Sequence, residues 1–214
     1  MAAASKKLAA LRDLLAARFP TVPRTAGRTL PTGIAAVDEA TGGLPLGAVT
    51  ELVSTQPSCG GQLFLGQLLA ATRAARIRVA LVDSTDSFDP NSHPPDHLAH
   101  LIWIRCRDIP AALQAADLLA RDANLGLVLL DLRDAPEHEL RRIPNRQWYR
   151  LQRAVEPTDL ALIVTTPRPS VASAQLRFVL GNSPTDTELE TERPRLVAQL
   201  APSLQRQRLQ AATA

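Results

Sequence analysis

The stretch that decides the fold is V-T-E-L-V-S-T-Q-P-S-C-G-G-Q-L, residues 49–63. Its first five residues are mostly apolar or β-branched, which predicts a strand. The small residues that follow predict a tight turn, and the apolar segment from Leu63 predicts a helix. A strand, a tight loop and a helix in this order form the setting in which many proteins bind phosphate groups.

The loop itself departs from the phosphate-binding pattern G-x-x-x-x-G-K-[ST], whose lysine reaches the phosphates and whose hydroxyl holds Mg²⁺. With Gly60 as the second glycine, Thr55 takes the place of the first. Gly61 then replaces the lysine, and Gln62 replaces the hydroxyl. Glycine carries no charge, and an amide is a poor ligand for a hard cation. We therefore expect a vestigial loop that holds no cofactor.

Composition sets broad limits on function. A chain of 214 residues suits one domain, and 45% hydrophobic residues can form a full core. The net charge of +3 permits a nucleic-acid partner without demanding one. Cys59 and Cys106 are the only cysteines, and their spacing fits no metal motif, so we expect a reduced, cytoplasmic protein without metal. The sequence contains no apolar run long enough to span a membrane.

Apolar periodicity predicts an α/β fold with a mainly parallel central sheet flanked by helices, in which the later strands are antiparallel. Three segments are expected: an N-terminal helix and extended linker, a core and a tail without a packing pattern, at 1–31, 32–201 and 202–214. Helices are expected at 5–18, 34–40, 62–76, 111–122 and 146–155. Strands are expected at 49–53, 79–83, 101–105, 127–131, 160–165, 175–180 and 195–200.

Four motifs together resemble the RecA core. The entry L-P-T-G-I-A-A-V-D-E-A-T-G-G-L-P-L-G-A-V-T-E-L-V, residues 30–53, has the family's T-G, a following Asp38 and then G-G-L-P-x-G. The later matches are V-D-S-T-D-S-F-D-P at 82–90, L-V-L-L-D at 127–131 and A-Q-L-R-F at 174–178. The resemblance implies a RecA-like core, with Asp131 as a vestigial Walker B acid.

The catalytic positions implied by this resemblance are altered. Thr85 stands where the family has the glutamate that polarises water, and Thr165-Thr166 stands where it has the γ-phosphate sensor. With the loop changes, four functional positions differ, so we expect no ATP hydrolysis and no enzyme activity. The alternative is a residual NTPase or nucleotide-binding regulator of the RecA or KaiC type.

Among RecA-like proteins, the short and nucleotide-deficient form resembles the ImuA-like family. That resemblance implies a role in DNA-damage tolerance, in SOS mutagenesis and translesion synthesis. It also implies three partners: a RecA-type recombinase, an ImuB-like protein and an error-prone DnaE-type polymerase.

The N-terminal helix is a candidate partner-binding element. Leu8, Leu11 and Leu15 line one face of residues 5–18. A helix of this length is marginal alone in water, so its apolar face needs a surface to cover. The linker gives it the reach to dock on a partner, and the alternative is that it folds back on its own core.

A basic cluster is a candidate surface for single-stranded DNA. Its members are Arg141, Arg142, Arg146, Arg150, Arg153 and the neighbouring Trp148. Arginine pairs well with phosphate, and aromatic rings can stack on unpaired bases. The alternative is a solvated basic helix with salt bridges to Glu137 and Glu139. The histidines 93, 97 and 100 lie near Asp96, but their turn-rich segment favours solvated side chains over a metal site.

Overall fold

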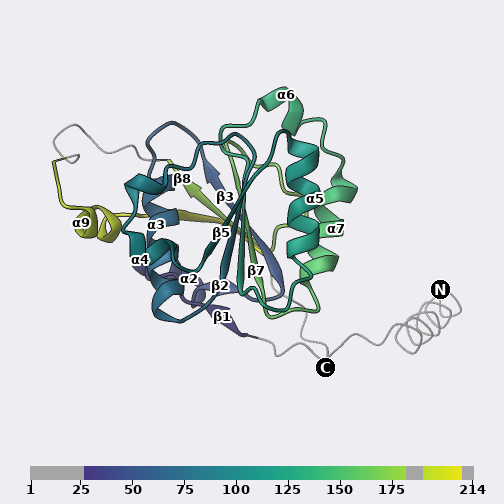
Figure 1. The fold of residues 1–214 in the computed structure, drawn as a ribbon. Helices are drawn as coiled ribbons and strands as arrows, with labels where there is room; N and C mark the ends of the chain where they lie inside the picture. Colours follow the sequence, from purple (N-terminus) through teal and green to yellow (C-terminus); the bar gives the residue numbers. More distant parts are fainter. Residues whose placement is uncertain (1–26, 182–189, 209–214) are drawn as a thin grey trace, which may run out of the picture.

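A seven-stranded sheet in the order β5-β4-β6-β7-β3-β8-β9 forms the centre of the molecule (Figure 1). The structure is a computed structural model, which describes residues 27–181 and 190–208. The strands of the sheet are β3 Ala48–Ser54, β4 Val79–Asp83, β5 Leu101–Arg105, β6 Leu127–Asp131, β7 Ala161–Thr166, β8 Leu176–Leu180 and β9 Ser203–Gln207. A small separate pair consists of β1 Thr29–Leu30 and β2 Leu44–Pro45.

Helices cover both faces of the sheet (Figure 1). They are α2 Ala35–Thr41, α3 Gly61–Ala74, α4 Pro95–Leu98, α5 Ile109–Leu119, α6 Glu137–Leu140, α7 Asn145–Val155 and α9 Arg193–Ala198, with a 3₁₀ turn η1 at Pro90–Ser92. One apolar cluster joins alternate strand residues to α5 and α7, and the other joins the intervening residues to α2 and α3. Successive strand residues point to opposite faces, so both faces of β4, β6 and β7 are buried.

The expected α/β fold, with a mainly parallel sheet flanked by helices, is confirmed, and the arrangement is consistent with a RecA-like core. The entry motif has a local structural role. The carboxylate of Asp38 accepts hydrogen bonds from the backbone N–H of Thr32 and of Gly33, both at 2.9 Å. Gly42 ends α2 in the left-handed conformation, at φ 71°, which glycine adopts without steric cost.

Three predictions for the carboxyl-terminal part are wrong. The segment expected as a strand at 195–200 forms helix α9, and the segment 202–214, expected as an unpacked tail, contains β9. The strand expected at 175–180 as antiparallel is β8, which runs parallel to β3. Only the final pair, β8 with β9, is antiparallel. The sheet therefore continues past the expected core boundary at residue 201.

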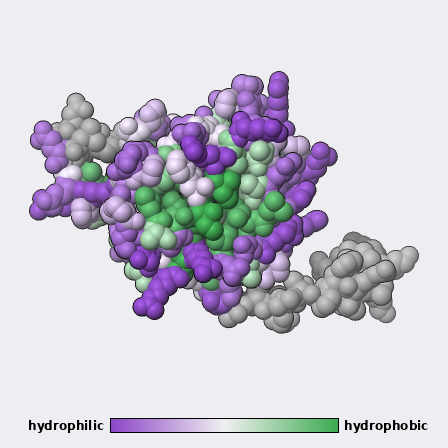
Figure 2. Space-filling model, in the orientation of Figure 1, coloured by the Kyte–Doolittle hydropathy of each residue, from purple (hydrophilic) through white to green (hydrophobic). Residues whose placement is uncertain are grey.

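Strand β5 has the expected bounds but is less buried than predicted. It lies at the edge of the sheet, with Ile102 47% exposed. Figure 2 shows apolar surface in the middle of this face, where Figure 1 places β5. A strand at the edge of a sheet has a neighbouring strand on one side only, so its side chains are covered less. The apolar run in the sequence looks the same as that of a central strand and does not reveal the edge position.

The helix expected at residues 5–18, with Leu8, Leu11 and Leu15, lies outside the described residues. The expected linker ends in β1, so its last residues pair with β2 and belong to the folded unit. None of the helices in the described part of the chain has the length and apolarity needed to cross a lipid bilayer.

Candidate functional site

The loop after β3 lies at the carboxyl edge of the sheet, where ligands bind in open α/β folds. Strand β7 separates β3 from β6, and the register places Asp131 beside Thr165 and Val53 beside Thr166. A depression of about 620 Å³ opens above this edge. Its lining consists of residues 54–63 with Arg133, Asp134, Pro167 and Leu196.

The loop keeps the backbone shape of a strand-to-helix turn. Gly60 precedes α3 with φ 96°, and Gly61 is the first residue of the helix. A Cβ atom on Gly60 would lie 2.5 Å from Cδ2 of Leu200, so the segment after α9 packs directly on the loop. Thr55 and Gln62 are exposed. Strand, turn and helix are therefore as predicted, and a C-terminal segment packs against the turn.

Asp131 lies at the end of β6 and is 4% exposed. Its Oδ2 accepts a hydrogen bond from Nη2 of Arg133 at 2.6 Å. Its Oδ1 accepts from the backbone N–H of Arg133 at 3.1 Å and from Oγ1 of Thr165 at 2.6 Å. Three donors from the chain itself surround this carboxylate, and a cation at the same oxygens would have to displace the Arg133 guanidinium.

The guanidinium of Arg133 also lies beside the loop. A Cβ atom on Gly61 would be 3.2 Å from Nη1 of Arg133 and 3.3 Å from Oγ of Ser54. The space that a lysine at this position would enter therefore already contains a positive charge. The Arg133 side chain is 12% exposed, so little water screens this charge.

Thr85 does not take the place of a general base. It is exposed, and its backbone N–H donates to Oδ1 of Asp83 at 3.2 Å. The buried Asp83 also accepts from the backbone N–H of Ser87 and of Phe88, at 3.2 and 3.0 Å. This carboxylate holds the loop after β4 by its backbone, which is a structural role.

Thr166 contacts a second buried carboxylate, Glu51 of β3. Glu51 is fully buried, and its Oε1 accepts from Oγ1 of Thr166 at 3.0 Å and from the backbone N–H of Ser170 and Val171 at 2.6 and 3.0 Å. Its Oε2 accepts from Nε of Arg177 at 2.6 Å. The loop after β7 is thus held in one geometry by Glu51.

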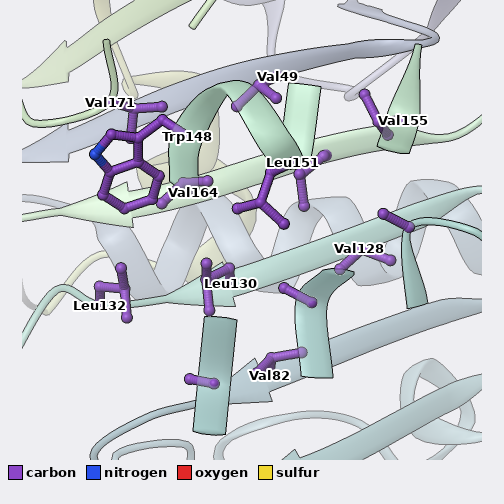
Figure 3. Close-up of a cluster of buried hydrophobic side chains, with 14 of the residues drawn as sticks. Val49, Val82, Val128, Leu130, Leu132, Trp148, Leu151, Val155, Val164 and Val171 are labelled. Carbon is purple, nitrogen blue, oxygen red and sulfur yellow. The ribbon is translucent and has the colours of Figure 1, made fainter. Parts of the chain in front are cut away.

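The basic cluster lies on α7 and on the turn that joins α6 to α7, but Trp148 is not part of its surface. Trp148 is 1% exposed and packs in the core near Val164 and Val171 (Figure 3). It cannot stack on a base, so the expectation that it contacts DNA is wrong. Its position in α7 places it with Leu151 and Val155, the inward face of the helix. The five arginines 141, 142, 146, 150 and 153 are all exposed.

Two of these arginines are engaged in ion pairs. Arg141 pairs with Glu137, as the alternative interpretation expected. Arg150 donates from Nε and Nη2 to the two carboxylate oxygens of Asp117 in α5, at 3.1 and 2.8 Å. Burial by itself would raise the pKa of Asp117, but hydrogen bonds from Arg150 and Arg121 outweigh it and hold that pKa below its usual value. Asp117 therefore stays ionised and fixes the Arg150 guanidinium on the surface.

His93 and His100 have separate surroundings. In the described part of the chain, no three His, Cys, Asp or Glu side chains come together as a cation would require. Nε2 of His100 lies 2.8 Å from Oγ1 of Thr72. His93 is buried against the ring of Phe88, with ring centroids 5.1 Å apart. Neither ring nitrogen of His93 has a hydrogen-bond partner among the described residues.

Acid is expected to destabilise the fold through His93. Burial and then the charge of Arg193 lower the pKa of His93, against the weaker opposing effect of Asp89. The unfolded chain, with a histidine pKa of about 6.5, therefore binds the proton first, and stability is lost as pH falls below that value. Denaturant titrations between neutral and mildly acidic pH should show this slope, and His93→Phe should reduce it. An unchanged slope in His93→Phe would contradict the assignment.

Three residues of this site were not predicted from the sequence: Arg133, Glu51 and Arg177. Glu51 has a visible signal, because it is the one charged residue in the strand V-T-E-L-V. Arg133 follows the strand-ending acid by two positions, which suggests proximity without showing that it reaches the loop. Nothing in the sequence connects Arg177 to Glu51, which is 126 positions away. No protein-family model matches this chain, and no curated protein is significantly similar to it.

Proposed function

We propose that this chain is a non-catalytic RecA-like accessory protein that acts by contacts with other macromolecules. The observation that carries the proposal is the state of Asp131, whose carboxylate is bound by Arg133 and Thr165 beside a loop without lysine. A nucleotide–Mg²⁺ complex needs the carboxylate oxygens of Asp131 and the space beside the loop, which Arg133 takes up. The proposal retains the cytoplasmic location expected from the sequence.

The proposed biological role follows the sequence resemblance to ImuA-like proteins. In this proposal the chain takes part in DNA-damage tolerance by contacting a RecA-type recombinase, an ImuB-like protein or an error-prone DnaE-type polymerase. Single-stranded DNA is a further proposed ligand, held by the exposed arginines through phosphate contacts and without stacking on Trp148, which is buried. The sheet and its flanking helices support the proposal by supplying the corresponding scaffold.

ATP is expected neither to bind at physiological concentration nor to be hydrolysed. Isothermal titration of ATP–Mg²⁺ into the full chain should give no heat of binding, and phosphate release should stay at the level of buffer. Micromolar affinity, or a turnover that Asp131→Ala abolishes, would establish the alternative of a residual nucleotide-binding regulator. That alternative is favoured by one observation, the depression of about 620 Å³ that persists at the loop.

Restoring the motif provides a sharper form of the same experiment. Gly61→Lys with Gln62→Thr recreates the lysine and the hydroxyl, yet should not create ATP binding while Arg133 occupies the adjacent space. Adding Arg133→Ser to that pair removes the competing charge. ATP binding by the triple variant alone would show that Arg133 is the decisive obstacle, whereas binding by the double variant would show that it is not.

Removing residues 1–22 is expected to abolish partner binding while the core stays folded. Burying each of Leu8, Leu11 and Leu15 on a partner could contribute about 1.5–3 kcal/mol, offset in part by the cost of association. A pull-down with a RecA-type recombinase and an assay of damage-induced mutagenesis would measure the loss. The variant with all three leucines changed to serine is the matched full-length control. A much lower melting temperature would assign the helix to internal packing, and retained binding would place the partner surface elsewhere.

A further inference from the structure

A groove lies between α5 and the segment α6–α7, on the side of the sheet opposite to α3 (Figure 1). Its volume is about 470 Å³. The apolar part of its lining is aliphatic and comprises Ile109, Pro110, Leu113, Ile143, Pro144 and Leu151. Leu113 and Ile143 are only partly buried, and they pack on the core cluster beneath. The groove therefore exposes apolar side chains that are packed from below against the hydrophobic core.

At the rim of this groove two arginines stand against two carboxylates, and the positive charge excess comes from Arg121, Arg146 and Arg153 just outside it. Arg142 and Arg150 line it together with Glu139 and Asp117. The charge of Asp117 is already matched twice, by Arg150 and by Arg121 at 3.1 Å. Arg142 makes no ion pair with any described residue, and the same holds for the nearby Arg146 and Arg153. Figure 2 shows hydrophilic side chains projecting at the side of the molecule where α5 and α7 lie.

The lining fits a polypeptide better than a nucleic acid. Nucleic-acid grooves that hold single strands supply aromatic rings on which bases stack. Here no Phe, Tyr or Trp is among the residues that line the groove: Trp148 is 1% exposed in the core, and the exposed Tyr149 of α7 lies outside the lining. Aliphatic side chains in a groove of this size are instead suited to bury the bulky apolar side chains of a peptide, as in grooves that bind helical or extended peptides. Cationic side chains around an apolar floor select acidic flanking residues.

We propose that this groove binds an acidic peptide segment of a partner protein, which inserts one or two bulky apolar side chains between α5 and α7. Arg142 and Arg150 contact carboxylates on either side of the inserted residues. Arg150 is suited to this because Asp117 holds its guanidinium in place before the peptide arrives, which lowers the ordering cost. The groove and its charges would favour such a peptide whether or not the chain has the proposed RecA-like role.

The test uses the full chain and a fluorescein-labelled peptide in which a Leu-Phe pair stands between two runs of aspartate. Fluorescence anisotropy should show saturable binding that weakens with salt. A peptide with Ser-Ser in place of Leu-Phe, and one with asparagine in place of aspartate, should each bind at least about tenfold more weakly, equivalent to about 1.4 kcal/mol. Equal binding of the Ser-Ser peptide, or no binding of the parent peptide, would overturn the proposal.

Two variants with matched controls separate the floor from the rim. Gln114 lines the groove and is exposed, so Gln114→Trp should fill the groove and weaken binding by about tenfold or more without changing any charge. Gln205→Trp, at an exposed position on β9, should have no effect. Arg142→Glu should weaken binding by about tenfold, and Arg208→Glu, which makes the same charge change elsewhere, should not.

Binding of oligothymidine distinguishes a peptide site from a DNA site. The Gln114→Trp variant should bind oligothymidine as tightly as the wild type does, because phosphate contacts do not use the groove floor. If Gln114→Trp weakens oligothymidine binding as strongly as peptide binding, the groove is a nucleic-acid site and the proposal is wrong. If Gln114→Trp changes neither, the groove is not a binding site, which also overturns it. Thermal melts of each variant confirm that the fold is intact.

Discussion

Arg133→Ala is expected to lower the free energy of unfolding by about 3–5 kcal/mol, the cost of leaving one member of a buried ion pair without its partner. The side chains of Arg133 and Asp131 are only 12% and 5% exposed. Removing the guanidinium leaves Asp131 with one hydroxyl and one backbone N–H in a site that water scarcely reaches. Equilibrium unfolding in denaturant measures the loss.

Two controls separate the ion pair from local packing. Asp134→Ala removes a neighbouring carboxylate that is 61% exposed and 3.9 Å from Nε of Arg133, so its effect should stay within about 0.5 kcal/mol. Combining Arg133→Ala with Asp131→Asn removes both charges and should recover part of the stability lost in the single variant. A loss below about 1 kcal/mol in Arg133→Ala would mean that the pair does not hold the carboxylate.

Glu51→Ala is expected to cost a similar amount, about 3–5 kcal/mol, because it too removes one partner of a buried pair. Arg177, whose side chain is 16% exposed, would lose its carboxylate partner. The backbone N–H groups of Ser170 and Val171 would also lose their acceptor. Buried donors without acceptors are costly, so the loop after β7 should open.

The effect on the loop provides an independent measurement. Hydrogen exchange of the Ser170 and Val171 amides should accelerate in Glu51→Ala more than exchange in β6 does. Glu51→Gln keeps the shape and one acceptor oxygen, so it should fall between the wild type and the alanine variant. Glu39→Ala, at an exposed position in α2, serves as the control. Unchanged exchange in the loop would show that Glu51 does not order it.

Strands with continuous apolar runs were predicted best. The bounds of β4, β5 and β6 agree with the expected ranges, because each run ends sharply at polar residues.

The carboxyl-terminal part was predicted worst, for a physical reason. The segment 195–200 is too short for its periodicity to separate helix from strand, although Pro194 is typical of a helix start. Strand β9 is largely polar, since only one side of an edge strand meets the core.

Helix α7 shows the same limit within one element. The spacing of Arg146, Arg150 and Arg153 correctly indicates an exposed face. Trp148 is adjacent to these arginines in the sequence, but a rotation of 100° per residue turns it toward the core, so the prediction that it shares their surface is wrong. The partner-binding prediction at Leu8, Leu11 and Leu15 and the DNA prediction for the arginines stay predictions, because only binding experiments address them.

By itself, the sequence determined that strands alternate with helices and that the loop after β3 lacks the lysine and the hydroxyl of a phosphate-binding loop. Both are local properties of apolar spacing and residue type. Only the tertiary structure decided that Arg133 enters the space beside Gly61, that Glu51 pairs with Arg177 and that Asp117 holds Arg150. These contacts join segments that become neighbours through strand order and helix packing, which arise from burial of the whole core, and local sequence does not specify them.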